Sequence, residues 1–199
     1  MKIIIGIDQS YKDTGITLAA DRKIKNVISL KLGKLEFNSE KRKVLKDTLN
    51  KIVIKMLNKS DDVTIIIERI RLSSQGFISM DYIKSIGALN AIMVDVAYNH
   101  NIPVYSVDTR SWKSNIIGTS KGEANPYGFD EKKWPTIKWA IRNGYEKYII
   151  EDVKNKRKKK GVVIKGERRI TYNDNKADSI GIALYGFLPE GKQKLVEEH

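Results

Sequence analysis

The pattern of hydrophobic and polar positions predicts three consecutive strands at the start of the chain. Residues Lys2 to Asp8 form a short apolar run rich in isoleucine, which is typical of a buried strand. Similar runs follow from Thr14 to Ala20 and, with more alternation, from Lys23 to Leu32. The segments between these runs, QSYKD and ADRK, are short enough for hairpin connections.

The rest of the chain alternates between helical and extended patterns. Apolar residues recur at helical spacing from Ser39 to Asn58, where Ser39 fits the N-cap position. Further helices are predicted at Ile78–Asn99, Thr109–Ile117, Lys132–Arg142 and Asn173–Leu188, and further strands at Val63–Glu68 and Pro103–Val107. This order predicts an α/β fold with a mixed five-stranded sheet flanked by helices. We expect one domain over residues 1–190 and a C-terminal tail over 191–199.

The balance of charge points to a polyanionic partner. The chain of 199 residues carries 37 basic and 24 acidic residues, a net charge of +13, which favours contact with nucleic-acid phosphates. Most of this excess lies in a basic insertion at about 154–170, where Lys154–Arg169 holds nine basic residues and one acid. The insertion is either a disordered arm that folds on DNA or a hairpin that pairs Val162–Ile164 with Ile170–Tyr172.

Composition also limits which catalytic groups the chain can use. The chain has no cysteine, which excludes disulfides, iron–sulfur clusters and thiol nucleophiles, and only two histidines, which leaves carboxylates as the plentiful catalytic groups. Carboxylate oxygens suit Mg²⁺ or Mn²⁺. We expect a cytoplasmic protein, because no segment has the roughly 18 apolar residues of a membrane span and the N-terminal MKIIIGID turns acidic too early for a signal peptide.

Four acidic residues stand where the apolar pattern makes a charge costly. Asp8 and Glu68 end two isoleucine-rich strands, and Asp174 and Asp178 lie four residues apart at the start of an apolar helix. If the two strands are neighbours, the carboxylates converge at one sheet edge. Such a cluster suits two divalent ions about 3.5–4 Å apart, one to activate water and one to stabilise the leaving 3′ oxygen of a phosphodiester.

Each acid also has a purely structural interpretation. Asp8 fits a turn, Glu68 fits a salt bridge with Arg69 or Arg71, and Asp174 fits a helix N-cap. All of them occur together on these elements, however, and the combination favours a metal-dependent nuclease site.

The same residues lie in four motifs that resemble those of the RuvC-type Holliday junction resolvases. GIDQSYKDTGI, with Asp8, resembles their opening motif, and IIIERI, with Glu68, resembles their second acidic motif. VDTRSWKSNIIGTSKGE resembles their region with a Lys-x-x-x-x-Gly pattern, here Lys113 and Gly118, and KADSIGIALYG resembles the final motif, in which Asp178 begins an apolar helix.

The resemblance implies an RNase H-like fold and a Mg²⁺-dependent homodimer that nicks four-way DNA junctions in recombination and repair. Three-way junctions and replication forks are further expected substrates. The sequence supports a dimer independently, because the helix Ile78–Asn99 is apolar on more than one face and its small residues Gly87, Ala88 and Ala91 permit close packing. A deeply buried core helix is the alternative.

This chain departs from the family pattern at three places. Gln9-Ser10 replaces the usual Pro-Gly after the first acid, and the basic insertion is longer. Asn175 occupies the position of the family's other acid or histidine, with Asp174 one residue earlier. We favour Asp174 as the fourth ligand, because a helix start absorbs a one-residue slip easily, and Asn175 stays open.

Basic and aromatic residues near these motifs are candidate DNA contacts. Lys113 is expected to contact phosphate beside the site, and residues after Glu68 are expected to contact phosphate or stack on bases at the branch point. The candidates are Arg69, Arg71, Phe77, Lys113, Lys121, Lys132, Lys133, Lys156, Arg157, Lys158, Lys159 and Lys160.

Two other functions compete with the nuclease. An actin-like ATPase or sugar kinase has a related fold, but the chain has no GxxxxGK motif and no second phosphate loop to pair with Asp13–Gly15. A non-catalytic protein that binds branched DNA is disfavoured by the four acids, which repel phosphates unless a metal ion lies between them.

Overall fold

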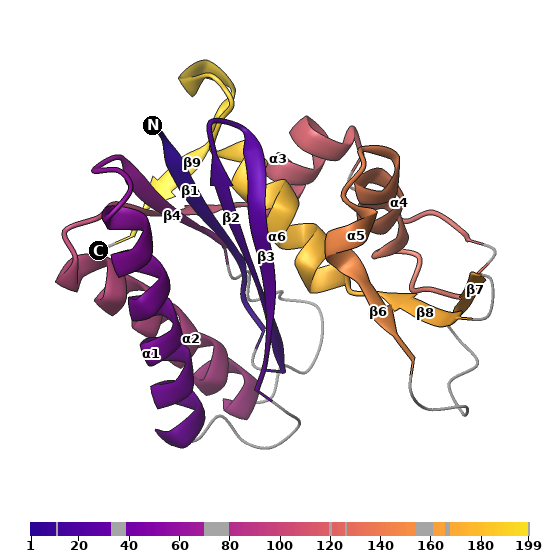
Figure 1. The fold of residues 1–199 in the computed structure, drawn as a ribbon, viewed down its shortest axis with the longest axis horizontal. Helices are drawn as coiled ribbons and strands as arrows, with labels where there is room; N and C mark the ends of the chain where they lie inside the picture. The colour runs from indigo at the N-terminus through magenta and orange to yellow at the C-terminus, as the bar shows by residue number, and fades with distance from the viewer. Residues whose placement is uncertain are drawn as a thin grey trace.

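A six-stranded mixed sheet forms the centre of the molecule, with helices against both of its faces (Figure 1). The computed structural model describes residues 1–10, 12–32, 39–69, 80–119, 121–125, 127–153, 161–165 and 168–198. The strands of this sheet are β1 (Ile3–Asp8), β2 (Asp13–Ala20), β3 (Lys23–Lys31), β4 (Val63–Glu68), β5 (Val104–Val107) and β9 (Leu195–Glu197). Their order is β3-β2-β1-β4-β5-β9, and β1, β4 and β5 are parallel neighbours.

The two faces of the sheet follow from the alternation of side chains along each strand. Ile3, Ile5 and Ile7 of β1 face one way and pack in a core with helices α1 (Ser39–Leu57) and α2 (Met80–Asn99). Ile4, between them, faces the other way and belongs to the core of α6 (Asp174–Tyr185). The isoleucine run is therefore continuous because both sides of the sheet are covered.

The remaining helices lie on the side of α6. They are α3 (Thr109–Trp112), α4 (Trp134–Arg142) and α5 (Glu146–Ile149), with a π-helical turn at Lys113–Ile117 and a 3₁₀ turn at Glu190–Lys192. The sequence predicted one helix over Thr109–Ile117, whereas the structure has a single α-turn that widens into the π-helical turn. Gly118, with a φ of 87°, ends this segment in the left-handed conformation.

A second, three-stranded sheet was not part of the predicted sheet. Its strands β6 (Ile150–Asp152), β7 (Val163–Lys165) and β8 (Arg168–Tyr172) have the order β6-β8-β7. β7 and β8 pair antiparallel with Val163 opposite Ile170, close to the pairing that the hairpin hypothesis predicted. The hairpin interpretation of this segment is therefore correct for its described strands, and the lysine-rich run 154–160 before them lies outside the described residues.

The C-terminal region also differs from the prediction. Leu195–Glu197, expected within a tail, forms β9 and pairs antiparallel with β5, which gives the main sheet six strands rather than five. Three residues carry too short a pattern to reveal a strand in the sequence. Among the described residues, no helix is both long and apolar enough to cross a membrane.

Candidate metal centre

Three of the four predicted acids converge at one end of the main sheet. Asp8 ends β1 and Glu68 ends the neighbouring strand β4, and the parallel register pairs Ile7 with Ile67 just before them. Asp178 reaches the same place from the second turn of α6. One carboxylate oxygen from each of these acids lies within 4.8 Å of the other two. Asp8 is also buried, with only 8% of its surface exposed. The structure thus gathers three carboxyl groups at one buried or partly buried place.

Close backbone contacts set the position of α6 over the strands. A Cβ on Gly15 of β2 would lie 2.1 Å from the carbonyl oxygen of Asn175, and one on Gly6 of β1 would lie 2.5 Å from the amide nitrogen of Ala183. Only glycine therefore fits at either position. Between them the hydroxyls of Thr17 and Ser179 are 2.7 Å apart. These contacts bring the helix close enough for Asp178 to reach the strand ends.

The N-terminus of α6 is also tied to both sheets by a polar network. Asn173 is the N-cap residue, and its Oδ1 accepts a 2.9 Å hydrogen bond from the Lys176 amide. Its Nδ2 donates to Asp13 of β2 at 2.8 Å and to Glu151 of β6 at 3.1 Å. Glu151 also pairs with Lys31 at 3.0 Å and with Lys176 at 3.2 Å. The helix that carries Asp178 therefore starts at a fixed point.

Burial and mutual repulsion make the cluster electrostatically costly. Burial raises the pKa of Asp8 well above its usual value, and the carboxylates of Asp178 and Glu68 raise it further. Burial also raises the pKa of Asp178 to about 6, while Lys113 acts in the opposite direction and Glu68 adds to the rise. A divalent cation among these oxygens would remove the repulsion.

The surroundings of Asp178 and Glu68 fit such a cation. The Oδ1 atom of Asp178 is buried and has no hydrogen-bond partner among the described residues, so one ligand position is free. The hydroxyl of Thr136 is near enough to lower the pKa of Asp178 slightly, although the two groups do not meet hydrogen-bond geometry. Three hard oxygen donors without histidine or cysteine are the set that Mg²⁺ and Mn²⁺ prefer.

Lys113, at the start of the π-helical turn, forms an ion pair with Asp178. Its Nζ lies 3.4 Å from Asp178 Oδ2, and both side chains are largely buried, at 13% and 15% exposure. The same Nζ lies 5.1 Å from the ring centre of Trp112, and Trp112 Nε1 approaches Glu68 Oε1 at 3.5 Å. The segment α3 to Gly118 therefore contacts two of the three acids.

Asp174, the predicted fourth ligand, is not part of the three-carboxylate cluster. It forms an ion pair of 2.5 Å with Lys133, yet its charge contributes to the raised pKa values of Asp8 and Asp178. The alternative fourth ligand, Asn175, donates its side-chain amide to the carbonyl of Asp13 in β2. Asp174 thus lies beside the site with a competing partner, whereas Asn175 is engaged with the sheet.

Three of the other predicted DNA contacts have exposed side chains. Arg69 follows β4 at the same sheet end, where its backbone amide donates to Val107 at 2.7 Å, and its side chain is exposed. Lys121 and Lys132 are exposed as well. The remaining candidates lie outside the described residues; these are Arg71, Phe77, Lys156, Arg157, Lys158, Lys159 and Lys160.

Two residues at the site were missed by the sequence analysis as functional candidates. Trp112 contacts Glu68 and Lys113, and a tryptophan in a short helix after a central strand gives no signal for such a role. Gln9 was noted only as a departure from the family pattern, yet its Nε2 donates to the backbone carbonyl of Glu68 at 2.8 Å.

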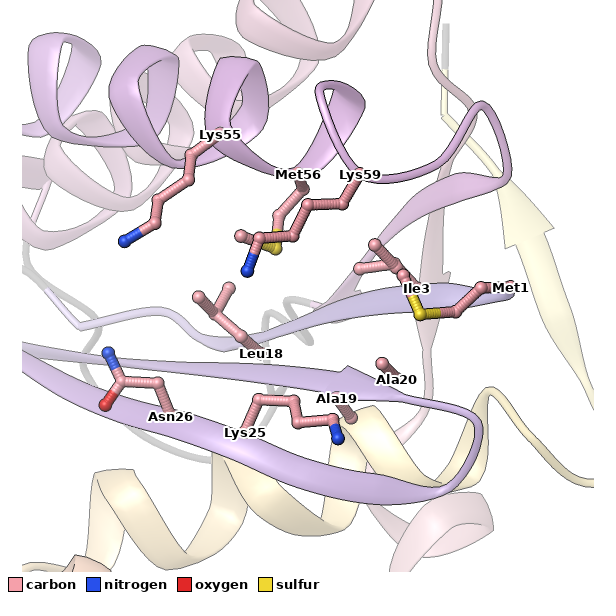
Figure 2. Close-up of a pocket in the computed structure, with 10 residues that line it drawn as sticks. All are labelled: Met1, Ile3, Leu18, Ala19, Ala20, Lys25, Asn26, Lys55, Met56 and Lys59. Carbon is pink, nitrogen blue, oxygen red and sulfur yellow. The ribbon is translucent and has the colours of Figure 1, made fainter.

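A hollow of about 520 Å³ lies away from the carboxylates, at the opposite end of β1 (Figure 2). Its lining includes the apolar side chains of Ile3 and Leu18 from the strands and of Met56 from α1, together with three lysines. Two of them, Lys55 in the last turn of α1 and Lys59 two residues after its end, lie where the helix dipole favours cations. The charge of the hollow therefore has a structural explanation, and it is separate from the candidate metal centre.

Comparison with known proteins identifies the fold. Solved structures similar to this chain include Thermus thermophilus RuvC in complex with Holliday junction substrate, with a TM-score of 0.55, 14% identity and 92% of each chain covered. A second structure of RuvC from Thermus thermophilus gives a TM-score of 0.53 at 14% identity, covering 92% of this chain and 91% of that one. The yeast mitochondrial Holliday junction resolvase Ydc2 gives 0.52 at 17% identity, covering 92% and 76%.

These likenesses confirm the fold predicted from the motifs. The architecture is the RNase H-like α/β fold, and within it the chain has the form seen in RuvC-type resolvases. No family model matches the sequence, and no curated protein is similar to it in sequence.

Proposed function

We propose that this protein is a metal-dependent endonuclease that nicks Holliday junctions and other branched DNA. The observation that carries the proposal is the group of Asp8, Glu68 and Asp178, whose carboxylate oxygens lie within 4.8 Å of one another. Its place in a fold shared with junction resolvases, one of them solved with Holliday junction substrate, supports the substrate.

Mg²⁺, or Mn²⁺ in its place, would be held by these three carboxylates in this proposal. Two such ions would supply an activated water for attack on phosphorus and positive charge for the leaving 3′ oxygen. Asp174 is the proposed fourth ligand, because it lies one helical turn before Asp178 on the same helix face.

The chain's own cations have a separate role in the proposal. Lys113 and Lys133 flank the acids and would contact phosphates of the bound strand, which offsets the repulsion between acids and DNA. The exposed Arg69, at the end of β4, would add to this positive charge, and the lysines of the basic insertion are further proposed DNA contacts. Net charge of +13 supports the same assignment.

Paired nicks need two sites, so we also propose a homodimer with α2 at its interface. The outward stripe of α2 includes Gly87 and Ala91 together with the charged Lys84 and Asp95, and ends in exposed Met80 and Tyr98, at 64% and 81% exposure. A Cβ on Gly87 would meet no atom within 4 Å. A helix of a second copy could therefore approach closely, and light scattering of wild type and Ala91→Glu tests this interface.

The cleavage assay uses labelled four-way, three-way and linear DNA with Mg²⁺, Ca²⁺ or EDTA. We expect nicks with 5′-phosphate ends in branched DNA with Mg²⁺, none in EDTA, and binding with little cutting in Ca²⁺, whose looser shell positions water poorly. Asp8→Asn and Glu68→Gln should bind junctions without cutting them. Binding without any cutting by wild type would indicate the non-catalytic protein instead, and cutting in EDTA would reject the metal site.

A further inference from the structure

The Gln9 side chain joins the two strands that carry the first two acids. The parallel pairing of β1 and β4 runs to Ile7 opposite Ile67 and stops there. Beyond that point Gln9 Nε2 donates a 2.8 Å hydrogen bond to the backbone carbonyl of Glu68. Because Gln9 follows Asp8 directly, this one bond connects the backbone beside Asp8 to the backbone of Glu68.

The other end of the same amide is unused. Gln9 Oε1 is buried and has no hydrogen-bond partner among the described residues. The orientation of the amide is settled by its partner, because a carbonyl oxygen only accepts and must therefore face the NH₂ group. A buried acceptor without a donor is unfavourable, and a water molecule held by a cation at the carboxylates is a donor that would satisfy it.

We propose that Gln9 is a positioning residue of the metal centre. Its Nε2 extends the β1–β4 pairing by one side-chain bond and so fixes the spacing of Asp8 and Glu68, and its Oε1 accepts a hydrogen bond from a water ligand of the bound ion. The inference rests on the proposed function. The Pro-Gly that the RuvC-type motif has after its first acid offers no side-chain amide, so this device belongs to the present chain.

The test measures Mn²⁺ binding to the DNA-free 199-residue chain by isothermal titration calorimetry. Gln9→Met keeps the length of the side chain but removes donor and acceptor, and we expect its Mn²⁺ dissociation constant to rise about 10-fold or more, as for groups that orient metal ligands. Gln193→Met is the matched control. Gln193 also donates to backbone carbonyls, those of Gly186 at 3.1 Å and of Leu188, but it lies away from the acids. Its variant should bind Mn²⁺ within twofold of wild type.

Two further variants distinguish an incorrect role for Gln9 from an incorrect metal site. Gln9→Asn stays polar but is one methylene too short to reach β4, so it should weaken Mn²⁺ binding like Gln9→Met, and it decides the matter if the methionine variant does not fold. Asp8→Asn should lose binding altogether. If wild type binds Mn²⁺ and the folded Gln9 variants bind it within twofold, the role of Gln9 is wrong while the metal site stands. If wild type binds none, both fail.

Discussion

The acidic cluster should destabilise the metal-free protein, and Asp178→Asn should relieve that cost. Burial raises the pKa of Asp178 from its usual 3.8 to about 6, with Lys113 lowering it and Glu68 raising it. At about 1.4 kcal/mol per tenfold change in proton affinity, this corresponds to about 3 kcal/mol. The side chain is only 15% exposed, so solvent screens little of this. We take about 3 kcal/mol as the upper bound of the gain.

The sign of the pH dependence follows from the raised pKa. Between pH 3.8 and about 6 the folded protein holds a proton on Asp178 that the unfolded chain has lost, so stability falls as pH rises through this window. The advantage of Asp178→Asn over wild type should therefore be largest at pH 8 and nearly absent at pH 4. Urea unfolding in EDTA at several pH values measures this difference in stability. In thermal unfolding, a gain of 3 kcal/mol would raise the Tm by roughly 6–12 °C.

A metal ion should reverse the order of the two proteins. Mg²⁺ at about 1,000 times its dissociation constant adds about 4.1 kcal/mol to wild type, which exceeds the gain of about 3 kcal/mol from the substitution, and adds much less to Asp178→Asn. Asp61→Asn is the control, because Asp61 is exposed and lies before the start of β4, at the other end of that strand from Glu68, so its change should stay within about 0.5 kcal/mol. Asp178→Asn no more stable than wild type at pH 8 in EDTA would refute the reasoning.

Three shorter predictions follow from other parts of the chain. Gly15→Ala should prevent stable folding or displace α6, because its Cβ would lie 2.1 Å from the Asn175 carbonyl oxygen; circular dichroism and urea unfolding report this, and near-wild-type stability would contradict the helix position. Burial raises the pKa of Glu151, but its hydrogen bonds to two lysines and Asn173 outweigh this and hold the pKa below 4.5. Glu151→Gln should therefore cost about 1 kcal/mol at pH 7, a difference that closes as pH falls below 4.5 and that unfolding curves at pH 3 and 7 would measure. Replacing Lys156–Lys160 with serine should weaken binding to all DNA shapes alike and lower the salt slope by up to roughly 0.9 per lost phosphate contact; selective loss of junction binding in a salt titration would instead show that this segment reads the branch.

The order of elements could be predicted because each long element carries a strong repeat. The isoleucine runs of β1 and β4 and the helical spacing of α1 and α2 extend over enough residues to fix the type of element. Asp8 and Glu68 were identifiable because a charge at the end of an apolar run needs a partner. A site residue can therefore be predicted from the sequence when its neighbours in the chain already make its charge unfavourable.

The parts that were missed depend on long-range contacts or on very short segments. The strands β6 and β9 have three residues each, too few for a periodic pattern. The bond from Gln9 to Glu68 spans 59 positions and depends on the parallel register of two strands. A glutamine after a strand looks the same in sequence whether its amide meets solvent or a neighbouring backbone.

The choice between Asp174 and Asn175 as the fourth ligand could not be predicted from the sequence for a different reason, because it depends on which ion is present. Moving Asp174 into a metal-free cluster would add a fourth negative charge to carboxylates that already repel one another, so Lys133 is the better partner for it. A divalent cation reverses that balance, and a DNA phosphate near Lys133 would compete for the lysine and free the acid. The position of Asn175 does not depend on an ion in this way, because its Nδ2 is held by the Asp13 carbonyl and its own backbone lies against Gly15. The fourth ligand is therefore best regarded as conditional, made available by the same ion and substrate that need it.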